Sequence, residues 1–449
     1  MKTALYLALI LITATPSWGQ NPLTKDSRVG IPPFEFDFAA FADSASNKNR
    51  LEVYYKLRNV GFSFVKKGST YKASYDLETT IIGPDGRTVA SQHSSEEFSV
   101  PDYEQTQSAE SYRINSNQFL VPPGTYEIKI QVTDKNSEEV SPAHRKVNVP
   151  NFKAAPIAMS HIELIGAFAD TAELERFKKG GRTVIPSVSH FYGDPDSLLV
   201  FYFELYANPP EAKNLLLSYE ITQRYHGAWS KETTSLNLEK PKTAFFADLS
   251  LSQLPPGEYK LKIAVKEGKQ DLDKQEVEFK MGWNWEAALT HNFKELIEIL
   301  RYFSREKDLK TLEKAAPEKR LEAWNAFWAQ RDPTPASRQN EAKEEFDRRI
   351  RFVDSYFAHM GLPGWRSDMG KIYIRYGEPD QVDEDPSGQR NTNPNRVNDP
   401  YSTNVTEIRR TGHASQTWYY FSYRRAFSFE DVTGNGSWVL KPPLDGRRF

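Results

Sequence analysis

The chain has no cysteine among its 449 residues, and its formal net charge is only −2 at pH 7. Neither disulfides nor thiolate-ligated zinc can therefore support the fold, so buried apolar surface must stabilise each domain. The missing basic excess argues against a nucleic-acid partner. The eight histidines are scattered, with no two of them three or four residues apart, and no glycine-rich phosphate loop is present. We expect no metal site and no cofactor.

Long apolar runs are also absent, except for Ala4–Ala14 near the N-terminus. This run follows Lys2 and is shorter than the ~20 residues that a bilayer core requires. Ser17-Trp18-Gly19 then supplies small residues for a cleavage site, so we predict a secretory signal peptide over residues 1–19. An uncleaved N-terminal anchor is the alternative. No transmembrane span is expected in the mature chain.

The sequence does contain a duplicated pattern. Ala40–Asp43 recurs as Ala167–Asp170, Leu51–Leu57 as Leu199–Leu205, and Val121–Ile130 as Leu254–Ile263, at offsets of 127, 148 and 133. Three matches in the same order indicate a repeat. In both copies a Pro-Pro-Gly turn precedes a strand with apolar residues at every second position. We predict two tandem all-β immunoglobulin-like sandwiches, over residues 30–150 and 156–282.

The pattern changes to a helical one at Trp283. Apolar residues with helical spacing are Leu289, Phe293, Leu296, Ile297, Leu300 and Phe303, and a further set is Phe346, Ile350, Val353, Phe357 and Met360. Pro317 suits the first turn of a helix between these two. We predict a helical segment over residues 283–360. Its acid-first pairs Glu344–Arg348, Glu345–Arg349 and Asp347–Arg351 are interpreted as a solvated helix face.

The most specific segment is Gly364–Asp380. The alternation of Ile372, Ile374 and Tyr376 with polar residues predicts a strand there. Residues 383–404 are rich in Asp, Asn, Pro and Ser and predict a long flexible loop. Further strands are expected at 405–408, 417–423, 426–430 and 437–440, the last two joined by a hairpin turn. Residues 361–449 are thus predicted as an antiparallel β region packed on the helices, in an α+β domain.

This C-terminal region, roughly residues 284–449, resembles the GWxTD domain of exported bacterial proteins. The residues that carry the resemblance are Phe327-Trp328, Arg331–Pro335, Asn340-Glu341, Gly364-Trp365, Asp368, Gly370, Ile372–Ile374, Tyr376–Asp380, Trp418–Tyr420 and Phe427–Phe429. Ser367 stands where the family name has Thr, which keeps the hydroxyl. The predicted signal peptide and this resemblance to exported bacterial proteins together lead us to expect a periplasmic, secreted or cell-surface location. The family has no established activity, so it implies no catalytic residue.

The segment around Trp365 allows two interpretations. In the first, Gly364, Trp365, Ser367 and Gly370 build a structural corner, with the indole buried and the hydroxyl bonded to its own turn. In the second, Trp365 is the floor of a ligand-binding pocket whose polar contacts are Asp368, Arg375 and Asp380. No hydrolase motif accompanies these residues, so no catalytic residue is predicted.

We therefore predict a binding or docking module of the cell envelope that performs no catalysis. Its partner would be an envelope or extracellular protein or a glycan. One alternative is a glycan-active hydrolase that uses polar groups near Trp365 and the 383–404 loop. Another is a structural component of an envelope assembly.

Overall fold

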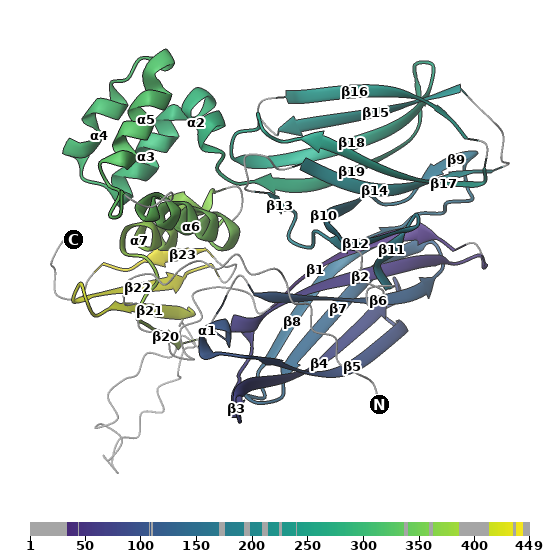
Figure 1. Ribbon diagram of the computed structural model, residues 1–449. Helices are drawn as coiled ribbons and strands as arrows, with labels where there is room; N and C mark the ends of the chain where they lie inside the picture. The colour runs from purple at the N-terminus through teal and green to yellow at the C-terminus, as the bar shows by residue number, and fades with distance from the viewer. Residues whose placement is uncertain are drawn as a thin grey trace, which may run out of the picture. The chain divides into compact units, whose positions relative to one another are not determined.

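The computed structural model describes residues 34–442, without 44, 107, 109–110, 170–175, 193–197, 209–213, 224–226, 239, 336–339, 359–361, 386–412 and 434–436. The predicted signal peptide, most of the predicted 383–404 loop, the predicted strand 405–408 and the turn at 434–436 lie outside these residues. The described chain divides into two compact units, one ending at Asn292 and one starting at Phe293 (Figure 1). None of its helices is both long and apolar enough to cross a bilayer.

The first unit begins with two sheets around one core, here called the first β-module. One sheet has the order β1-β2-β6 and consists of β1 (Phe34–Ala42), β2 (Asn49–Arg58) and β6 (Tyr112–Val121). The other contains β3 (Val65–Lys67), β4 (Thr70–Ile82), β5 (Thr88–Val100), β7 (Gly124–Asp134) and β8 (Val140–Val149). Short helical turns lie at Asn59–Gly61 and Tyr103–Thr106. Alternate residues of β7 enter the shared core, as the sequence predicts.

The second β-module follows with two further sheets. One contains β9 (Ile157–Met159), β10 (Glu163–Ala169), β11 (Lys178–Lys179), β12 (Arg182–Pro186), β14 (Leu198–Ala207) and β17 (Lys242–Ser250). The other contains β13 (Phe191–Tyr192), β19 (Gln270–Met281), β18 (Gly257–Glu267), β15 (Asn214–Gln223) and β16 (Gly227–Asn237), in that order. Helix α2 (Trp285–His291) ends the unit.

The duplicated segments fold alike. The hydroxyl of Tyr126 in β7 donates to the carbonyl of Pro122 at 2.9 Å, and the hydroxyl of Tyr259 in β18 donates to Pro255 at 2.7 Å. In each copy this bond fixes the Pro-Pro-Gly turn to the strand that follows it.

The two β-modules pack against each other through a separate apolar cluster. Its buried members are Ala39, Phe41, Tyr54, Ile165, Phe177, Val184, Val188 and Tyr202. They come from β1 and β2 of the first module and mainly from β10, β12 and β14 of the second. Strands β1, β2 and β14 therefore bury side chains on both faces, which explains why β2 and β14 are so rich in apolar residues.

The second unit consists of helices followed by a small antiparallel sheet. The helices are α3 (Phe293–Phe303), α4 (Glu306–Glu313), α5 (Arg320–Ala329), α6 (Glu341–Tyr356) and α7 (Asp368–Tyr376), with short 3₁₀ turns at Pro317–Lys319 and Gly364–Arg366. The sheet order is β20 (Gln381–Asp385), β21 (Ser415–Tyr420), β22 (Arg425–Asp431), β23 (Trp438–Leu440). The prediction of a mostly β chain with C-terminal helices and a small antiparallel sheet is confirmed.

The strand predicted over residues 371–376 is wrong, because these residues belong to helix α7. The side chain of Ser367 accepts a hydrogen bond from the backbone N–H of Gly370 at 2.9 Å and thereby caps the helix. Met369, Gly370, Tyr373 and Ile374 are the buried residues, which is a helical spacing. Ile372, Ile374 and Tyr376 do alternate with other residues along the sequence, but of these three only Ile374 belongs to the buried face of the helix.

Three further predictions are corrected. The helical spacing predicted from Leu289 to Phe303 does not belong to one helix, because these residues are divided between α2 and α3 around Asn292. The predicted loop cannot begin at Asp383, because residues 381–385 form β20 and pair with β21. The strand β21 ends at Tyr420 rather than 423, since residues 421–424 turn the chain and Arg424 has a φ of 52°.

Candidate functional site

The segment around Trp365, from Gly364 to Gly370, forms a tightly packed corner between α6 and α7. A Cβ atom at Gly364 would collide with the carbonyl oxygen of Val353 in α6. A Cβ atom at Gly370 would collide with the carbonyl oxygen of Gly364. Trp365 is 3% exposed, and its backbone N–H donates to Asp354 at 3.3 Å. Both glycines are thus required for close backbone approach, and the indole is part of the core.

Ser367 and Asp368 complete this corner. The Ser367 hydroxyl donates to the Gly364 carbonyl at 2.6 Å while it caps α7. The Asp368 carboxylate accepts from the Lys371 ammonium at 3.0 Å and from the backbone N–H of Leu440 in β23 at 3.0 Å. Asp368 also lines a small cavity of 350 Å³ with Arg366, Met369 and Trp438. These bonds make Asp368 a link between the helix and the sheet.

The structure does not bring the four predicted ligand-binding residues together. Asp368 is the first residue of α7, whereas Asp380 follows the end of that helix and accepts from the backbone N–H of Phe421 at 2.6 Å. Arg375 is exposed on α7, with its guanidinium 5.9 Å from the ring of Tyr376. Trp365 is buried away from solvent. This placement favours the structural interpretation of the segment, and a ligand-binding role for these residues stays a prediction.

The charged face of α6 is not simply a solvated surface. Glu345 and Arg349 form the predicted pair at 2.6 Å, but Arg348 also pairs with Glu345, at 2.8 Å. The Arg349 side chain is only 13% exposed and donates to the carbonyl of Ile374 in α7 at 2.9 Å. The bond from Arg349 to Ile374 therefore holds α6 against α7, while the ion pairs with Glu345 lie within α6. Charge spacing along one helix cannot reveal the second helix, which is why the sequence suggested a solvated face.

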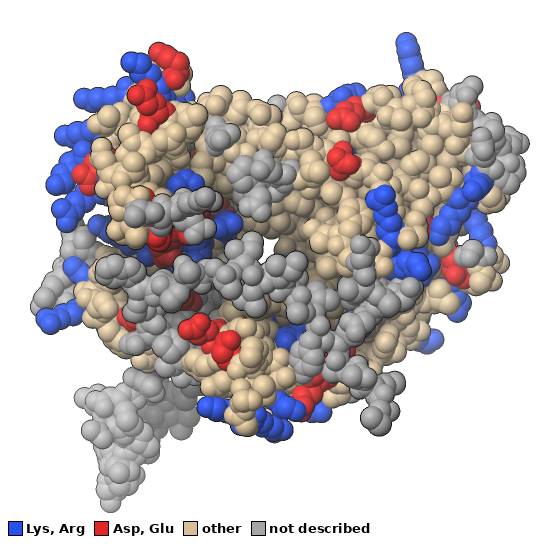
Figure 2. All heavy atoms as spheres, in the orientation of Figure 1, with Lys and Arg blue, Asp and Glu red and all other residues tan. Residues whose placement is uncertain are grey.

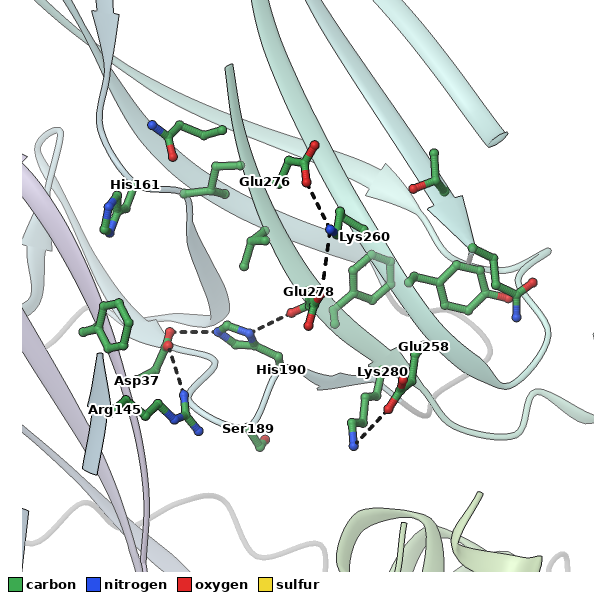
Figure 3. A pocket seen from close by; sticks show the side chains of 18 residues that line it. Asp37, Arg145, His161, Ser189, His190, Glu258, Lys260, Glu276, Glu278 and Lys280 are labelled. Carbon is green, nitrogen blue, oxygen red and sulfur yellow. Dashed lines mark hydrogen bonds and ion pairs between the residues drawn. The ribbon is translucent and has the colours of Figure 1, made fainter. Parts of the chain in front are cut away.

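A cavity lies in the first unit, where the two β-modules meet, and is called here the junction cleft (Figure 3). Its volume is about 1110 Å³. The first β-module contributes Asp37 and Phe38 of β1 and Arg145 of β8. The second contributes a larger wall from His161, Ser189, His190, Glu258, Tyr259, Lys260 and residues 275–280. The lining thus combines both signs of charge with neutral polar and aromatic side chains.

His190 spans the cleft base between the modules. Its Nε2 lies 2.8 Å from Asp37, and its Nδ1 lies 2.9 Å from the carbonyl oxygen of Glu278. Burial alone would raise the pKa of Asp37, but His190 and Arg145 hold this pKa below its usual value. Burial alone would lower the pKa of His190, but the Asp37 carboxylate raises it. His190 also has a φ of 50°, a strained conformation that its contacts must maintain.

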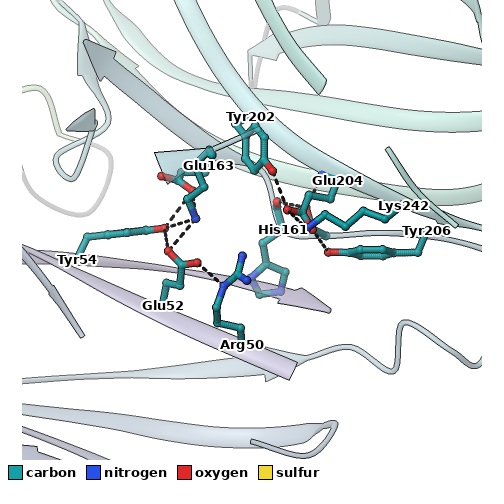
Figure 4. Close-up of polar contacts among 11 residues, drawn as sticks. Arg50, Glu52, Tyr54, His161, Glu163, Tyr202, Glu204, Tyr206 and Lys242 are labelled. Carbon is teal, nitrogen blue, oxygen red and sulfur yellow. Dashed lines mark hydrogen bonds and ion pairs between the residues drawn. The ribbon is translucent and has the colours of Figure 1, made fainter. Parts of the chain in front are cut away.

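Beside the cleft, a buried ion cluster joins the modules (Figure 4). The ammonium of Lys179 lies 2.7 Å from Glu52 of the first module and 3.0 Å from Glu163 of the second. The hydroxyl of Tyr54 lies 2.7 Å from Glu52 and 3.0 Å from Glu163. Arg50 adds a 2.6 Å bond to Glu52. One ammonium therefore serves two carboxylates from two modules.

A third buried carboxylate extends this cluster. Glu204 accepts from the hydroxyls of Tyr202 at 2.7 Å and Tyr206 at 2.6 Å, and it pairs with Lys242 at 2.7 Å. The hydroxyl of Tyr206 in turn accepts from the backbone N–H of Ala42 in the first module at 2.8 Å. The two modules are therefore fixed by hydrogen bonds as well as by apolar contact.

Sequence reasoning missed both the cleft and the ion cluster. The available signal was a glutamate inside an apolar stretch, Glu52 within Leu51–Tyr55 of β2 and Glu204 within β14. An acidic residue in such a run usually requires a buried partner. The partner Lys179 lies 127 residues from Glu52, so the sequence does not identify it.

No group of three or more His, Asp or Glu side chains in the described part of the chain is arranged to hold a metal ion. The described candidate sites are therefore the corner at Trp365 and the junction cleft.

The second unit defines an α+β domain, in which helices precede a small antiparallel sheet. Residues 279–429 match the family model of the GWxTD domain. The C-terminal region of this chain is a GWxTD domain, and the match includes the corner at Gly364–Asp368.

No curated protein matches the chain. Among solved structures, a red sea bream transglutaminase aligns at 9% identity over 56% of this chain and 32% of its own, with a TM-score of 0.18. A family 2 glycosyl hydrolase from Bacteroides cellulosilyticus DSM 14838 aligns at 9% identity over 51% and 28%, with a TM-score of 0.21. A β-glucuronidase from Parabacteroides merdae aligns at 10% identity over 58% and 30%, also with a TM-score of 0.21. The aligned part spans about a third or less of those chains, and such TM-scores carry no argument.

Proposed function

We propose that this protein is an exported component of the bacterial envelope that binds a partner without catalysing a reaction. The observation that carries the proposal is the junction cleft, a cavity of 1110 Å³ between two modules that buried ion pairs hold together. Binding sites commonly lie where two folded modules meet. A cleft with fixed walls loses little conformational freedom when a partner binds.

The bonding within the cleft supports binding rather than catalysis. Both ring nitrogens of His190 already have protein partners, so a substrate would have to displace one of them to exchange a proton with this ring. The carboxylate of Glu276 lies 3.1 Å from Lys260, and that of Glu258 lies 3.5 Å from Lys280. These groups offer ionic and hydrogen-bonding contacts to a ligand.

The separation of Asp368 and Asp380 gives no support to the alternative of a glycan-active hydrolase at Trp365. The face drawn in Figure 2 carries Lys and Arg together with Asp and Glu, and a partner other than nucleic acid fits this mixture.

The finer architecture is part of the proposal. Two consecutive modules, each with two sheets around a core and each with the same Pro-Pro-Gly and tyrosine arrangement, are consistent with tandem immunoglobulin-like sandwiches. In this proposal they serve as a rigid platform, while the GWxTD domain supplies a second surface at the envelope. The partner is an envelope or extracellular protein or a glycan.

The test compares two charge reversals on corresponding strands. Lys260→Glu, in β18, would place an acidic side chain beside Glu276 and Glu278 in the cleft. Lys129→Glu is the control, because Lys129 lies on β7 outside the junction cleft. Tagged wild-type protein and both variants are used for affinity capture from envelope extracts. We expect a partner that wild type and K129E retain and K260E loses. Equal capture by all three would contradict binding at the cleft.

A further inference from the structure

Strand β19 has an open edge inside the junction cleft. Its inner side pairs with β18 along its whole length, whereas β13 pairs only with Lys280 and Met281 on its outer side. Residues 275–278 of this strand line the cleft (Figure 3). The edge of a sheet with unpaired N–H and C=O groups is a template for an additional strand.

The bonds at the end of β19 reveal which backbone groups face outward. The N–H of Lys280 donates to His190, and the carbonyl of Glu278 accepts from the His190 ring, both on the outer side. Successive residues of a strand direct their backbone groups to opposite sides, so Glu276 also faces outward. Among the described residues, nothing bonds to the N–H and C=O of Glu276 or to the N–H of Glu278. The N–H and C=O of Glu276 suffice to pair with one residue of an added strand, and the N–H of Glu278 offers one further hydrogen bond to that strand.

We propose that this edge accepts an extended peptide segment of the partner as an added β-strand. The proposal rests on the proposed function and names the class of partner, a polypeptide rather than a glycan. Backbone hydrogen bonds to Glu276 and Glu278 hold the segment, and side chains on the cleft walls select its sequence. The His190 ring already bonds to the carbonyl of Glu278, so the edge that is available to an added strand ends there.

The charges at the edge favour a basic residue in the bound segment. The Glu278 side chain is 83% exposed and lies 3.8 Å from its nearest cation, Lys260, which binds Glu276 more closely at 3.1 Å. A residue of the added strand next to Glu278 would lie at cross-strand distance from its carboxylate. Lys or Arg there would pair with it, whereas Asp or Glu would be repelled. The opposite wall of the cleft contains the half-buried ring of Phe38, which suits an apolar side chain.

The experiment pairs two substitutions at one position. Glu276→Ala removes the carboxylate and keeps the backbone N–H, whereas Glu276→Pro removes both. Because this N–H faces outward, proline there interrupts no bond to β18. Short random peptides displayed on phage are selected against the full chain, and the enriched peptide is titrated against all three proteins. We expect E276P to bind about tenfold more weakly than E276A, since it loses a donor and its ring obstructs the edge.

Other outcomes separate the two proposals. Equal weakening in E276A and E276P means that the cleft binds through side chains, which overturns strand addition and leaves the binding function intact. Unchanged binding in both variants places the peptide elsewhere and contradicts the cleft as its site. Selection that enriches no peptide overturns strand addition, and capture of a partner by wild type but not by K260E would still support the binding function.

A second measurement does not depend on the folding of E276P. The enriched peptide is synthesised with a single N-methyl group at each position in turn and titrated against wild-type protein. Strand addition predicts strong loss of binding at alternate positions, where the peptide N–H faces β19. Equal tolerance at every position overturns the proposal.

Discussion

At the scale of single residues, two buried carboxylates share the ammonium of Lys179 but differ in their surroundings. Burial alone would raise the pKa of Glu52, but Lys179, Arg50 and the Tyr54 hydroxyl lower it. Burial raises the pKa of Glu163, an effect that Lys179 reduces and the Glu52 charge increases. The Oε1 atom of Glu163 has no hydrogen-bond partner in the described structure. The ionised form is therefore stabilised at Glu52 and destabilised at Glu163.

We expect opposite effects from the corresponding amide substitutions. Glu52→Gln would lower the free energy of unfolding by about 3 kcal/mol at pH 7, because it leaves Lys179 and Arg50 without their common carboxylate. Glu163→Gln would change it by less than about 1 kcal/mol, because Glu52 still neutralises Lys179. Urea unfolding of both variants measures this difference. Similar losses would mean that the two carboxylates contribute equally.

The pair of His190 and Asp37 gives a pH dependence with a definite sign. The pKa of His190 is raised above 6.5, so its contribution to stability is fully present below that pH and is lost as pH rises through its folded-state value. The pKa of Asp37 is lowered below 3.8, so its contribution is fully present above that pH and is lost as pH falls through its folded-state value. Between these limits the pair is ionised and stabilises the junction.

The variant His190→Asn tests this sign. Asparagine tolerates the positive φ at this position but does not titrate. The difference in unfolding free energy between wild type and H190N should be largest near the acid side of pH 6.5 and should shrink as pH rises. Thermal or urea unfolding over a pH series measures it. A difference that grows with pH would contradict a charged His190.

At the scale of elements, the contact between the 3₁₀ turn at Gly364–Arg366 and helix α7 reverses the usual effect of a glycine-to-alanine substitution on helix stability. Replacing glycine by alanine inside a helix usually stabilises it by about 1 kcal/mol. In α7 the same change at Gly370 would drive a methyl group into the carbonyl of Gly364. We expect Gly370→Ala to destabilise the second unit by at least about 2 kcal/mol.

The matched control is Arg375→Ala, on the exposed side of the same helix. It should change stability by less than about 0.5 kcal/mol. Urea unfolding followed by tryptophan fluorescence compares the two variants. If G370A is as stable as R375A, the backbones do not approach each other as described.

The same element marks the limit of what the sequence could predict. Strands β7 and β18 were predicted because only one periodicity fits their apolar residues. In α7 two periodicities fit, and the capping bond of Ser367 selects the helix. The sequence analysis expected the Ser367 hydroxyl to bond within its own turn, but it did not predict that this residue begins a helix. The cleft was beyond prediction, because it depends on which faces of two modules meet.

At the scale of the whole first unit, the ion cluster and the apolar junction couple the two β-modules. Lys179→Ala would leave Glu52 and Glu163 buried beside each other without their shared cation, which is strongly unfavourable. We expect the junction to open in this variant while each module retains its own core. The exposed change Lys129→Ala is the control.

Hydrogen exchange measured by mass spectrometry can detect this coupling. In wild type, core amides of both modules should become exchangeable together in one cooperative opening. In K179A, β7 and β18 should lose protection at different denaturant concentrations, and K129A should behave as wild type does. Separate opening of the modules in wild type would mean that the junction does not couple them.

Any side chain at Gly364 or Gly370 would collide with the backbone. This constraint explains what the motif that gives the GWxTD domain its name does in the structure. The motif residues form a bend in the backbone: the Trp365 indole is buried, and the Ser367 hydroxyl bonds to the carbonyl of Gly364 across the turn. In this chain the motif residues therefore identify the joint between α6 and α7, and the joint by itself identifies no ligand.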